Sequence, residues 1–325
     1  MKQTFVELRA PVGAFTVAVF AALGLAQPAQ AGESLFGWTY LAEVLPSGGL
    51  EGELWSTYRT KKSQGTYNLW QNRAEIEYGI TDRWQVSLYL NQYSVKAEAN
   101  NSKASRNNFT VVGDGDEVSG GGPVTFGAYV PFYGKLPIPS APYSKSAFES
   151  VSLETIYQFT SPYKDGVGLA GYLEYSKGSK VEEFELKAIV QKNLLEDQLI
   201  LAANIALEFE NEKWSGIGTE KETLLQFSAG ASYRFAPAWH AGLELRNDRG
   251  YKNHSLSSGD RDYSAWFLGP NISYTAPSWF VTLTYMGQMP WATAYSDPAR
   301  VEQVSGRNYK AGERDNWRLK VGYSF

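Results

Sequence analysis

The chain has 325 residues and a formal net charge of −4, too small an imbalance to indicate a nucleic-acid partner. It contains no cysteine, which excludes disulfides, thiolate metal sites, iron–sulfur clusters and c-type haem attachment, and we expect no cofactor. The 31 glycines and 21 tyrosines are typical of a membrane β-barrel, provided that the chain is exported.

The N-terminal region, 1–31, has the layout of a secretory signal peptide. Lys2 and Arg9 form a charged region, an apolar stretch covers 11–26, and an Ala-Gln-Ala motif ends at Ala31. This pattern predicts cleavage after Ala31. A membrane anchor is the alternative, but the apolar stretch is shorter than the roughly 20 residues that a spanning helix needs. No comparably long apolar run follows, so the mature chain is expected to be soluble or a β-barrel.

Alternation of apolar and polar residues is the main signal in the mature chain. Residues 32–49 precede it, and we interpret them as a periplasmic lead-in or a segment tucked into the mouth of a barrel. Within 68–79, for example, the two alternating sets are Trp70, Ala74, Ile76 and Tyr78 against Gln71, Arg73, Glu75 and Glu77. A helix would place these charges on every face, whereas a strand separates the two sets. A strand of a membrane barrel shows alternate side chains to lipid and to the lumen, so residues 50–325 are predicted to form an outer-membrane β-barrel.

The repeated pattern predicts an all-β, transmembrane, antiparallel up-and-down barrel of twelve strands. These are 50–59, 68–79, 84–95, 148–159, 167–175, 182–192, 199–209, 222–235, 239–247, 263–274, 279–286 and 314–325. Counting back from the C-terminus places the short connections in the periplasm and the long ones outside, as such barrels require. The predicted external loops are 96–147, 210–221, 248–262 and 287–313. Aromatic residues flank most of the short turns, which indicates an interfacial girdle.

Two segments complicate the count of strands. Pro270 lies inside the tenth predicted strand and cannot donate to the ladder, so we expect a bulge or a local gap there. Residues 124–130 also alternate, and with 109–112 they could form an additional hairpin. Fourteen strands is therefore the alternative to twelve.

The last predicted strand carries the most specific signal. Its outward set, which runs to the final residue, is Trp317, Leu319, Val321, Tyr323 and Phe325. With aromatic residues at the last and third-last positions, this strand resembles the assembly signal of Gram-negative outer-membrane barrels. The resemblance implies location in the cell outer membrane, with outer-membrane lipid and the barrel-assembly machinery as partners.

Two longer stretches also resemble known families. TYNLWQNRAEIEYGITDRWQVSLYL at 66–90 is similar to the strand–turn–strand of outer-membrane transporter families of the phenol-degradation type. The region 147–209, with SLETIYQF, GLAGYLEY and LILAANIALEFE, resembles an uncharacterised barrel family of the same general group. The resemblance implies a barrel and carries no catalytic signature.

Charged residues of both signs are predicted to line the lumen, with acids outnumbering bases. The candidate selectivity residues are Arg73, Glu75, Glu77, Glu154, Glu183, Glu185, Lys187, Glu208, Arg234, Glu244, Arg246, Arg318 and Lys320. Lumen charge sets ion selectivity, so we expect a narrow channel or transporter for small ions or solutes with a weak preference for cations. Pairs on neighbouring strands, such as Glu244 with Arg234, are expected to narrow the bore. The alternative is a closed structural or assembly barrel without transport. A sheath for a multihaem partner is disfavoured, because a twelve-stranded bore is too narrow.

Two further chemistries are weak candidates. Asp114, Asp116 and Glu117 lie among glycines and could hold a divalent cation through oxygen ligands, although such a run is more often a solvated loop tip. A lipid hydrolase would need a base beside a hydroxyl, and only His240 and His254 are available as histidine bases. The stretch that begins at His254 has the wrong spacing for the membrane lipases, so we expect no enzymatic activity.

Overall fold

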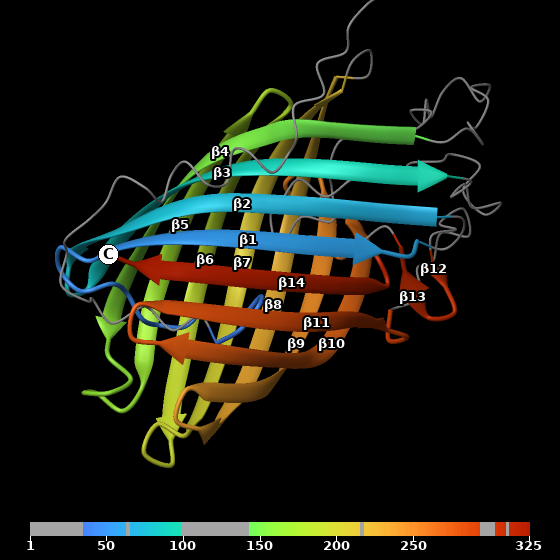
Figure 1. Ribbon diagram of the computed structural model, residues 1–325. Helices are drawn as coiled ribbons and strands as arrows, with labels where there is room; N and C mark the ends of the chain where they lie inside the picture. The colour runs from blue at the N-terminus through green and yellow to red at the C-terminus, as the bar shows by residue number, and fades with distance from the viewer. Residues whose placement is uncertain (1–34, 63–65, 99–142, 215–217, 293–302, 310–311) are drawn as a thin grey trace, which may run out of the picture.

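The computed structural model describes residues 35–62, 66–98, 143–214, 218–292, 303–309 and 312–325. Within these ranges, twelve antiparallel strands close into one barrel (Figure 1). They are β1 (Leu50–Thr60), β2 (Thr66–Thr81), β3 (Trp84–Glu98), β4 (Tyr143–Thr160), β5 (Gly168–Gly178), β6 (Val181–Leu194), β7 (Leu199–Trp214), β8 (Gly218–Ala236), β9 (Trp239–Lys252), β10 (Arg261–Ala276), β11 (Trp279–Met289) and β14 (Asp315–Ser324). No helix in the described residues is long and apolar enough to cross a membrane.

The predicted twelve-stranded architecture is confirmed. Neighbours in sequence pair throughout, and β14 closes the wall by pairing with both β11 and β1. The segments 109–112 and 124–130, on which the fourteen-strand alternative rested, lie outside the described residues. A separate two-stranded sheet is formed by β12 (Gln303–Val304) and β13 (Arg307–Asn308).

The interruption expected at Pro270 is also confirmed. Along β9 the ladder continues through Pro270 opposite Leu243. Along β11 the pairing stops after Leu268 and resumes at Asn271, which leaves the imide nitrogen of the proline without a ladder position to fill.

The barrel has a short-turn end and a long-loop end. The short turns, the C-terminus and residues 46–49 all lie at one end, which is the periplasmic end in outer-membrane barrels (Figure 1). At the other end, β7 runs to Trp214 and β8 starts at Gly218, so the prediction of a long external loop over 210–221 is wrong. Paired strands of 16 and 19 residues exceed the 9–11 needed to cross a bilayer, and the ladder therefore continues beyond the membrane. In the predicted loop 96–147, β3 and β4 occupy the two ends and 99–142 lies outside the described residues.

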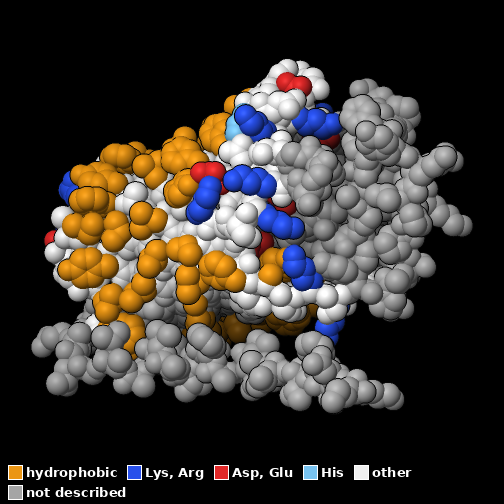
Figure 2. All heavy atoms as spheres, turned by 90° about the horizontal axis from the view of Figure 1, so that it is seen from above, with side chains coloured by type: hydrophobic (Ala, Val, Ile, Leu, Met, Phe, Trp, Pro, Cys, Tyr) orange, Lys and Arg blue, Asp and Glu red, His pale blue; other side chains and the backbone are white. Residues whose placement is uncertain are grey.

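The outer wall presents an apolar belt. Hydrophobic side chains cover the part of the surface nearer the periplasmic end, and Lys and Arg side chains gather nearer the external end (Figure 2). Aromatic rings are grouped at the short turns, where Trp239, Tyr274 and Trp279 stack with centroids 4.9 and 5.1 Å apart. This girdle and belt match the lipid-facing surface of an outer-membrane barrel.

The N-terminal segment, defined here as residues 35–45, lies inside the barrel. Trp38 is 1% exposed and packs in a collar of inward-facing apolar residues, which comprises Ala206, Leu224, Tyr263, Ala265, Phe267 and Met286. Leu35 and Phe36 pack on β7, and Ala42 packs against β4, β5 and β6. The wall closes without this segment, and the segment fills part of the space that the wall encloses.

Candidate functional site

Glu244, in the middle of β9, holds the N-terminal segment at its deepest point. The carboxylate accepts hydrogen bonds from three successive backbone N–H groups, those of Gly37 (2.7 Å), Trp38 (2.8 Å) and Thr39 (3.1 Å). Its side chain is fully buried. A buried carboxylate that receives several N–H donors is well satisfied, and in return it satisfies backbone groups that would otherwise lack partners in the lumen.

Amide side chains of the wall continue this recognition along the segment. Each binds a backbone N–H or carbonyl group at 2.6–3.0 Å: Asn204 with Tyr40, Gln191 and Gln158 with Ala42, and Gln85 with Leu45. The contacts come from β3, β4, β6 and β7, which lie within one continuous stretch of the wall, so that side of the barrel binds residues 40–45. Because these bonds engage backbone groups, they fix the path of the segment more than the identity of its side chains.

Cationic side chains of the lumen stack on aromatic rings, some of which belong to the N-terminal segment. Arg318 lies 4.5 Å and Arg246 5.2 Å from the Trp38 ring. Lys187 lies between the rings of Tyr40 (3.9 Å) and Tyr172 (4.1 Å). Such contacts are worth about 0.5–2 kcal/mol each, depending on desolvation. The aromatic rings of the segment therefore bind cationic side chains that would otherwise face an open bore.

Two glycines allow the segment to approach the wall. A Cβ at Gly37 would lie 2.7 Å from the side chain of Thr284, and one at Gly230 would lie 2.5 Å from the ring of Phe36. Side chains at these positions would force the segment away from the wall. The packing of residues 35–45 against the wall thus depends on the absence of a side chain at Gly37 in the segment and at Gly230 in the wall.

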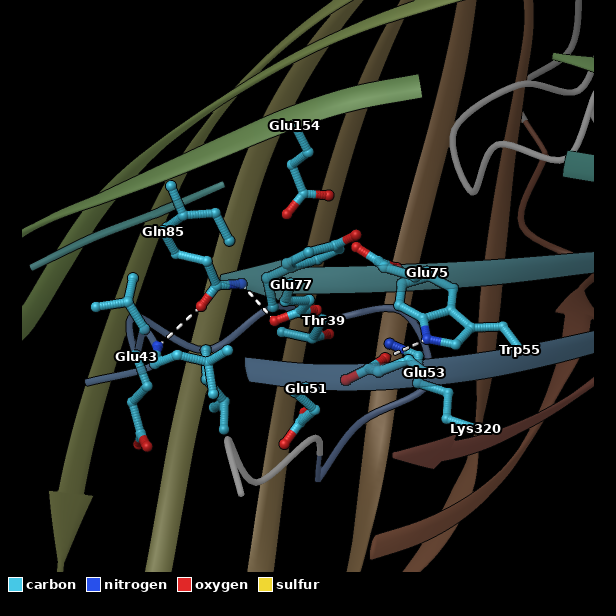
Figure 3. Close-up of a pocket in the computed structure, with 15 residues that line it drawn as sticks. Thr39, Glu43, Glu51, Glu53, Trp55, Glu75, Glu77, Gln85, Glu154 and Lys320 are labelled. Atoms are coloured by element: carbon cyan, nitrogen blue, oxygen red, sulfur yellow. Dashed lines mark hydrogen bonds between the residues drawn. The ribbon is translucent and has the colours of Figure 1, made fainter. Parts of the chain in front are cut away.

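A cavity of about 80 Å³ remains beside the segment, in the periplasmic half of the lumen (Figure 3). Its described lining carries one ammonium group, that of Lys320, and six carboxylates: Glu43, Glu51, Glu53, Glu75, Glu77 and Glu154. Carboxylate oxygens of Glu53, Glu75 and Glu77 all lie within 4.8 Å of one another. We refer to this space as the acidic cavity.

The structure places all the predicted lumen residues on the inward face of the strands. Glu77 and Arg234 are half-buried, and buried positions are occupied by Arg73, Glu75, Glu154, Glu183, Glu185, Lys187, Glu208, Glu244, Arg246, Arg318 and Lys320. The predicted pairing of Glu244 with Arg234 is wrong. Glu244 lies opposite Gly230 and binds the N-terminal segment, while Arg234 lies opposite His240 and donates to the carbonyl of Glu196 in a periplasmic turn. Their separation along the strands, together with the N–H groups offered by the segment, decides against the ion pair.

Other predicted residues lie away from this site. Asp114, Asp116 and Glu117 fall outside the described residues. His254 contacts the backbone carbonyl of Glu210 at 2.9 Å and packs edge-on against Phe209. On the outer face, the ring of Tyr323 packs against that of Phe325 with centroids 5.1 Å apart.

Sequence reasoning gave a segment tucked into the barrel mouth as one of two interpretations of residues 32–49, but it did not identify the lumen residues that bind 35–45. The segment lacks period two, so alternation carries no information about it. A signal does exist on the wall, where apolar residues occupy inward positions such as Ala206, Leu224 and Phe267. Apolar groups on a lumen face indicate that something packs on them.

Comparison with known proteins places the chain in a family. The model of a family of unknown function (DUF6662) matches residues 28–325. The chain belongs to this family. No curated protein sequence matches it. The family gives no support to the resemblance to phenol-degradation-type transporters, which stays an expectation.

Two solved structures resemble the chain at low sequence identity. The COG4313 outer membrane channel from Pseudomonas putida F1 is 11% identical with a TM-score of 0.54, over 87% of this chain and 98% of that one. The NanC porin is 9% identical with a TM-score of 0.47, over 84% of this chain and 98% of that one. The first likeness establishes the fold alone. Together with the apolar belt and aromatic girdle, it identifies the chain as an outer-membrane β-barrel.

Proposed function

We propose that this protein is a narrow outer-membrane channel or transporter for small ions or solutes, closed in the present state by residues 35–45. One observation carries the proposal: a wall that is complete by itself encloses a segment of its own chain, held by noncovalent contacts to lumen side chains. Displacement of the segment would leave the barrel intact. A twelve-stranded bore lies between the filled eight-stranded barrels and the open porins, so it suits small solutes.

The lining supports a weak preference for cations. The acidic cavity lies in the periplasmic half of the bore and presents six carboxylates against one ammonium group among its described residues. A surplus of negative charge in a confined, partly dehydrated space attracts cations and repels anions. A solved barrel of the same fold is described as an outer membrane channel, which supports the proposal.

A closed structural barrel is the second candidate, and the depth of burial of Trp38 favours it. A segment this well packed could be a permanent part of the core. The two candidates differ in whether loosening the segment produces conduction.

Substitution of Gly37 provides the test. In planar bilayers, Gly37→Val should raise the open probability at least tenfold over the wild type, because the added side chain meets Thr284. Gly259→Val is the matched control, since a Cβ there meets only Ser257 Oγ at 3.8 Å, and it should behave as the wild type. A folded Gly37→Val variant that remains silent at all voltages would favour the closed structural barrel.

A further inference from the structure

We infer that the acidic cavity binds one divalent cation of the Ca²⁺ class, with Glu53, Glu75 and Glu77 as its carboxylate ligands. Nothing in this inference depends on conduction, because the site is complete in the closed state. Its geometry fits a single ion. Ca²⁺ binds oxygen at 2.3–2.6 Å, so ligands on opposite sides of one ion lie up to about 5 Å apart. The carboxylate oxygens of the three residues lie within 4.8 Å of one another.

The register of the strands brings these like charges together. Glu53 on β1 lies directly opposite Glu75 on β2, and Glu51 lies opposite Glu77. Like charges at directly opposed positions destabilise a strand pair. A cation between the strands would turn this repulsion into attraction.

Glu154 supplies an independent observation. It comes from β4, is 2% exposed, and its carboxyl group points into the cavity toward Glu75 and Glu77 (Figure 3). Its Oε2 has no hydrogen-bond partner among the described residues. A buried carboxylate oxygen without a donor is costly, and the positive charge of an ion bound in the cavity would lower that cost.

Two of the protein's own cations lie beside these carboxylates and also stack on aromatic rings. Arg73 Nη1 is 3.9 Å from Glu75 Oε2, at the limit of an ion pair, and the guanidinium stacks between the rings of Trp55 and Tyr89. Lys320 Nζ lies 3.6 Å from the centroid of the Trp55 ring. These stacked cations are too few to neutralise the carboxylates that line the cavity.

Polar neighbours orient the proposed ligands. Trp55 Nε1 donates to one carboxylate oxygen of Glu53, and Gln85 Nε2 donates to one carboxylate oxygen of Glu77 (Figure 3). Neither donor engages the second oxygen of its carboxylate. The lining offers carboxylate, amide and hydroxyl oxygens and includes no histidine among its described residues. Oxygen-only sites select hard cations, and an irregular site with room for water suits the flexible coordination of Ca²⁺ better than the strict octahedron of Mg²⁺.

Calorimetric titration of the full-length protein in detergent with CaCl₂, after removal of metal by a chelator, tests the inference. We expect one Ca²⁺ per barrel and at least tenfold weaker binding of Mg²⁺. The Glu53→Gln/Glu75→Gln/Glu77→Gln variant should lose at least a hundredfold in affinity. Glu174→Gln is the control, because Glu174 is a buried lumen carboxylate that already accepts hydrogen bonds from Tyr172 and Ser176.

Folding of each variant is checked by its heat-dependent gel mobility. If the triple variant does not fold, Glu77→Gln alone decides, since Glu77 is only half-buried, and it should weaken Ca²⁺ binding at least tenfold. Absence of stoichiometric Ca²⁺ binding by the wild type would overturn the inference. Unchanged affinity in the folded variants, or an equal loss in Glu174→Gln, would do the same. A silent bilayer recording would leave it standing, so its failure is distinct from that of the proposed channel.

Discussion

The middle of the lumen and its periplasmic half contain buried carboxylates in contrasting situations. Around Glu244, three backbone N–H groups of the N-terminal segment converge on a single carboxylate. Around Glu75, carboxylates of neighbouring strands converge on one another. The first region is completed by the protein's own chain, and the second calls for a ligand from outside. Burial alone therefore does not identify a binding site. The two regions differ in whether hydrogen-bond donors of the protein satisfy the buried carboxylates.

Truncation of Trp38 should have the largest effect on the completed region. Trp38→Ala removes a buried ring from the apolar collar, and such losses cost about 3–5 kcal/mol in a rigid core. We expect residues 35–45 to detach and become sensitive to protease, while the barrel keeps its resistance to detergent. Trp239→Ala removes a ring from the outer girdle and should leave the segment protected. Equal protection in both variants would contradict the role assigned to the collar.

Removal of the Glu244 carboxylate should weaken the same region somewhat less. Glu244→Ala leaves three N–H groups without their acceptor, and each unsatisfied group costs about 1–3 kcal/mol if it stays buried. Relaxation of the segment into water limits this cost, so we expect a total of about 2–4 kcal/mol. Hydrogen exchange of the Gly37–Thr39 amides measures it. Glu174→Ala, which removes a carboxylate bonded only to side-chain hydroxyls in the described contacts, should leave that exchange unchanged.

The acidic cavity should govern ion preference. In a channel opened by deletion of residues 35–45, Glu75→Gln/Glu77→Gln should shift the reversal potential toward anions in a KCl gradient with a chelator present. The reason is the loss of two carboxylates from a lining rich in them. The shift should shrink as salt rises, since mobile ions screen the remaining charge. An unchanged reversal potential at low salt would show that the cavity does not lie on the ion path.

The smallest expected effect is on acid stability, and it concerns Glu313, a carboxylate outside the spanning segments that is paired with Lys62. Burial opposes ionisation of Glu313, but Lys62, at 2.8 Å, and Arg59 outweigh burial and hold its pKa below the ordinary value. Its contribution to stability is therefore present above the unfolded-state pKa and is lost as pH falls through the lower folded-state pKa. The Glu313→Gln variant should show a flatter acid-unfolding curve than the wild type. Identical curves would mean that Glu313 makes no such contribution.

The sequence predicted the wall far better than its contents. Alternation such as that of 68–79 follows from the two environments of each strand, and it located all twelve strands of the barrel. The end of β7 was predicted too early. Strand pairing continues beyond the membrane, where outward-facing residues are not in contact with lipid and need not be apolar, so the alternation stops before the strand does. Glu244 was given the wrong partner because only neighbouring strands were considered. In a closed lumen, a segment from the other end of the chain competes for the same carboxylate.

The conductance of a variant that lacks residues 35–45 tests the central claim most directly. With the wild type and the Gly259→Val control reconstituted alongside, the deletion should turn rare, small openings into a stable, narrow conductance. The wall should keep the heat-dependent gel mobility of the intact barrel, because its twelve strands pair without the segment. A correctly folded deletion variant that conducts no better than the wild type would contradict the account of these residues as the closure of a channel.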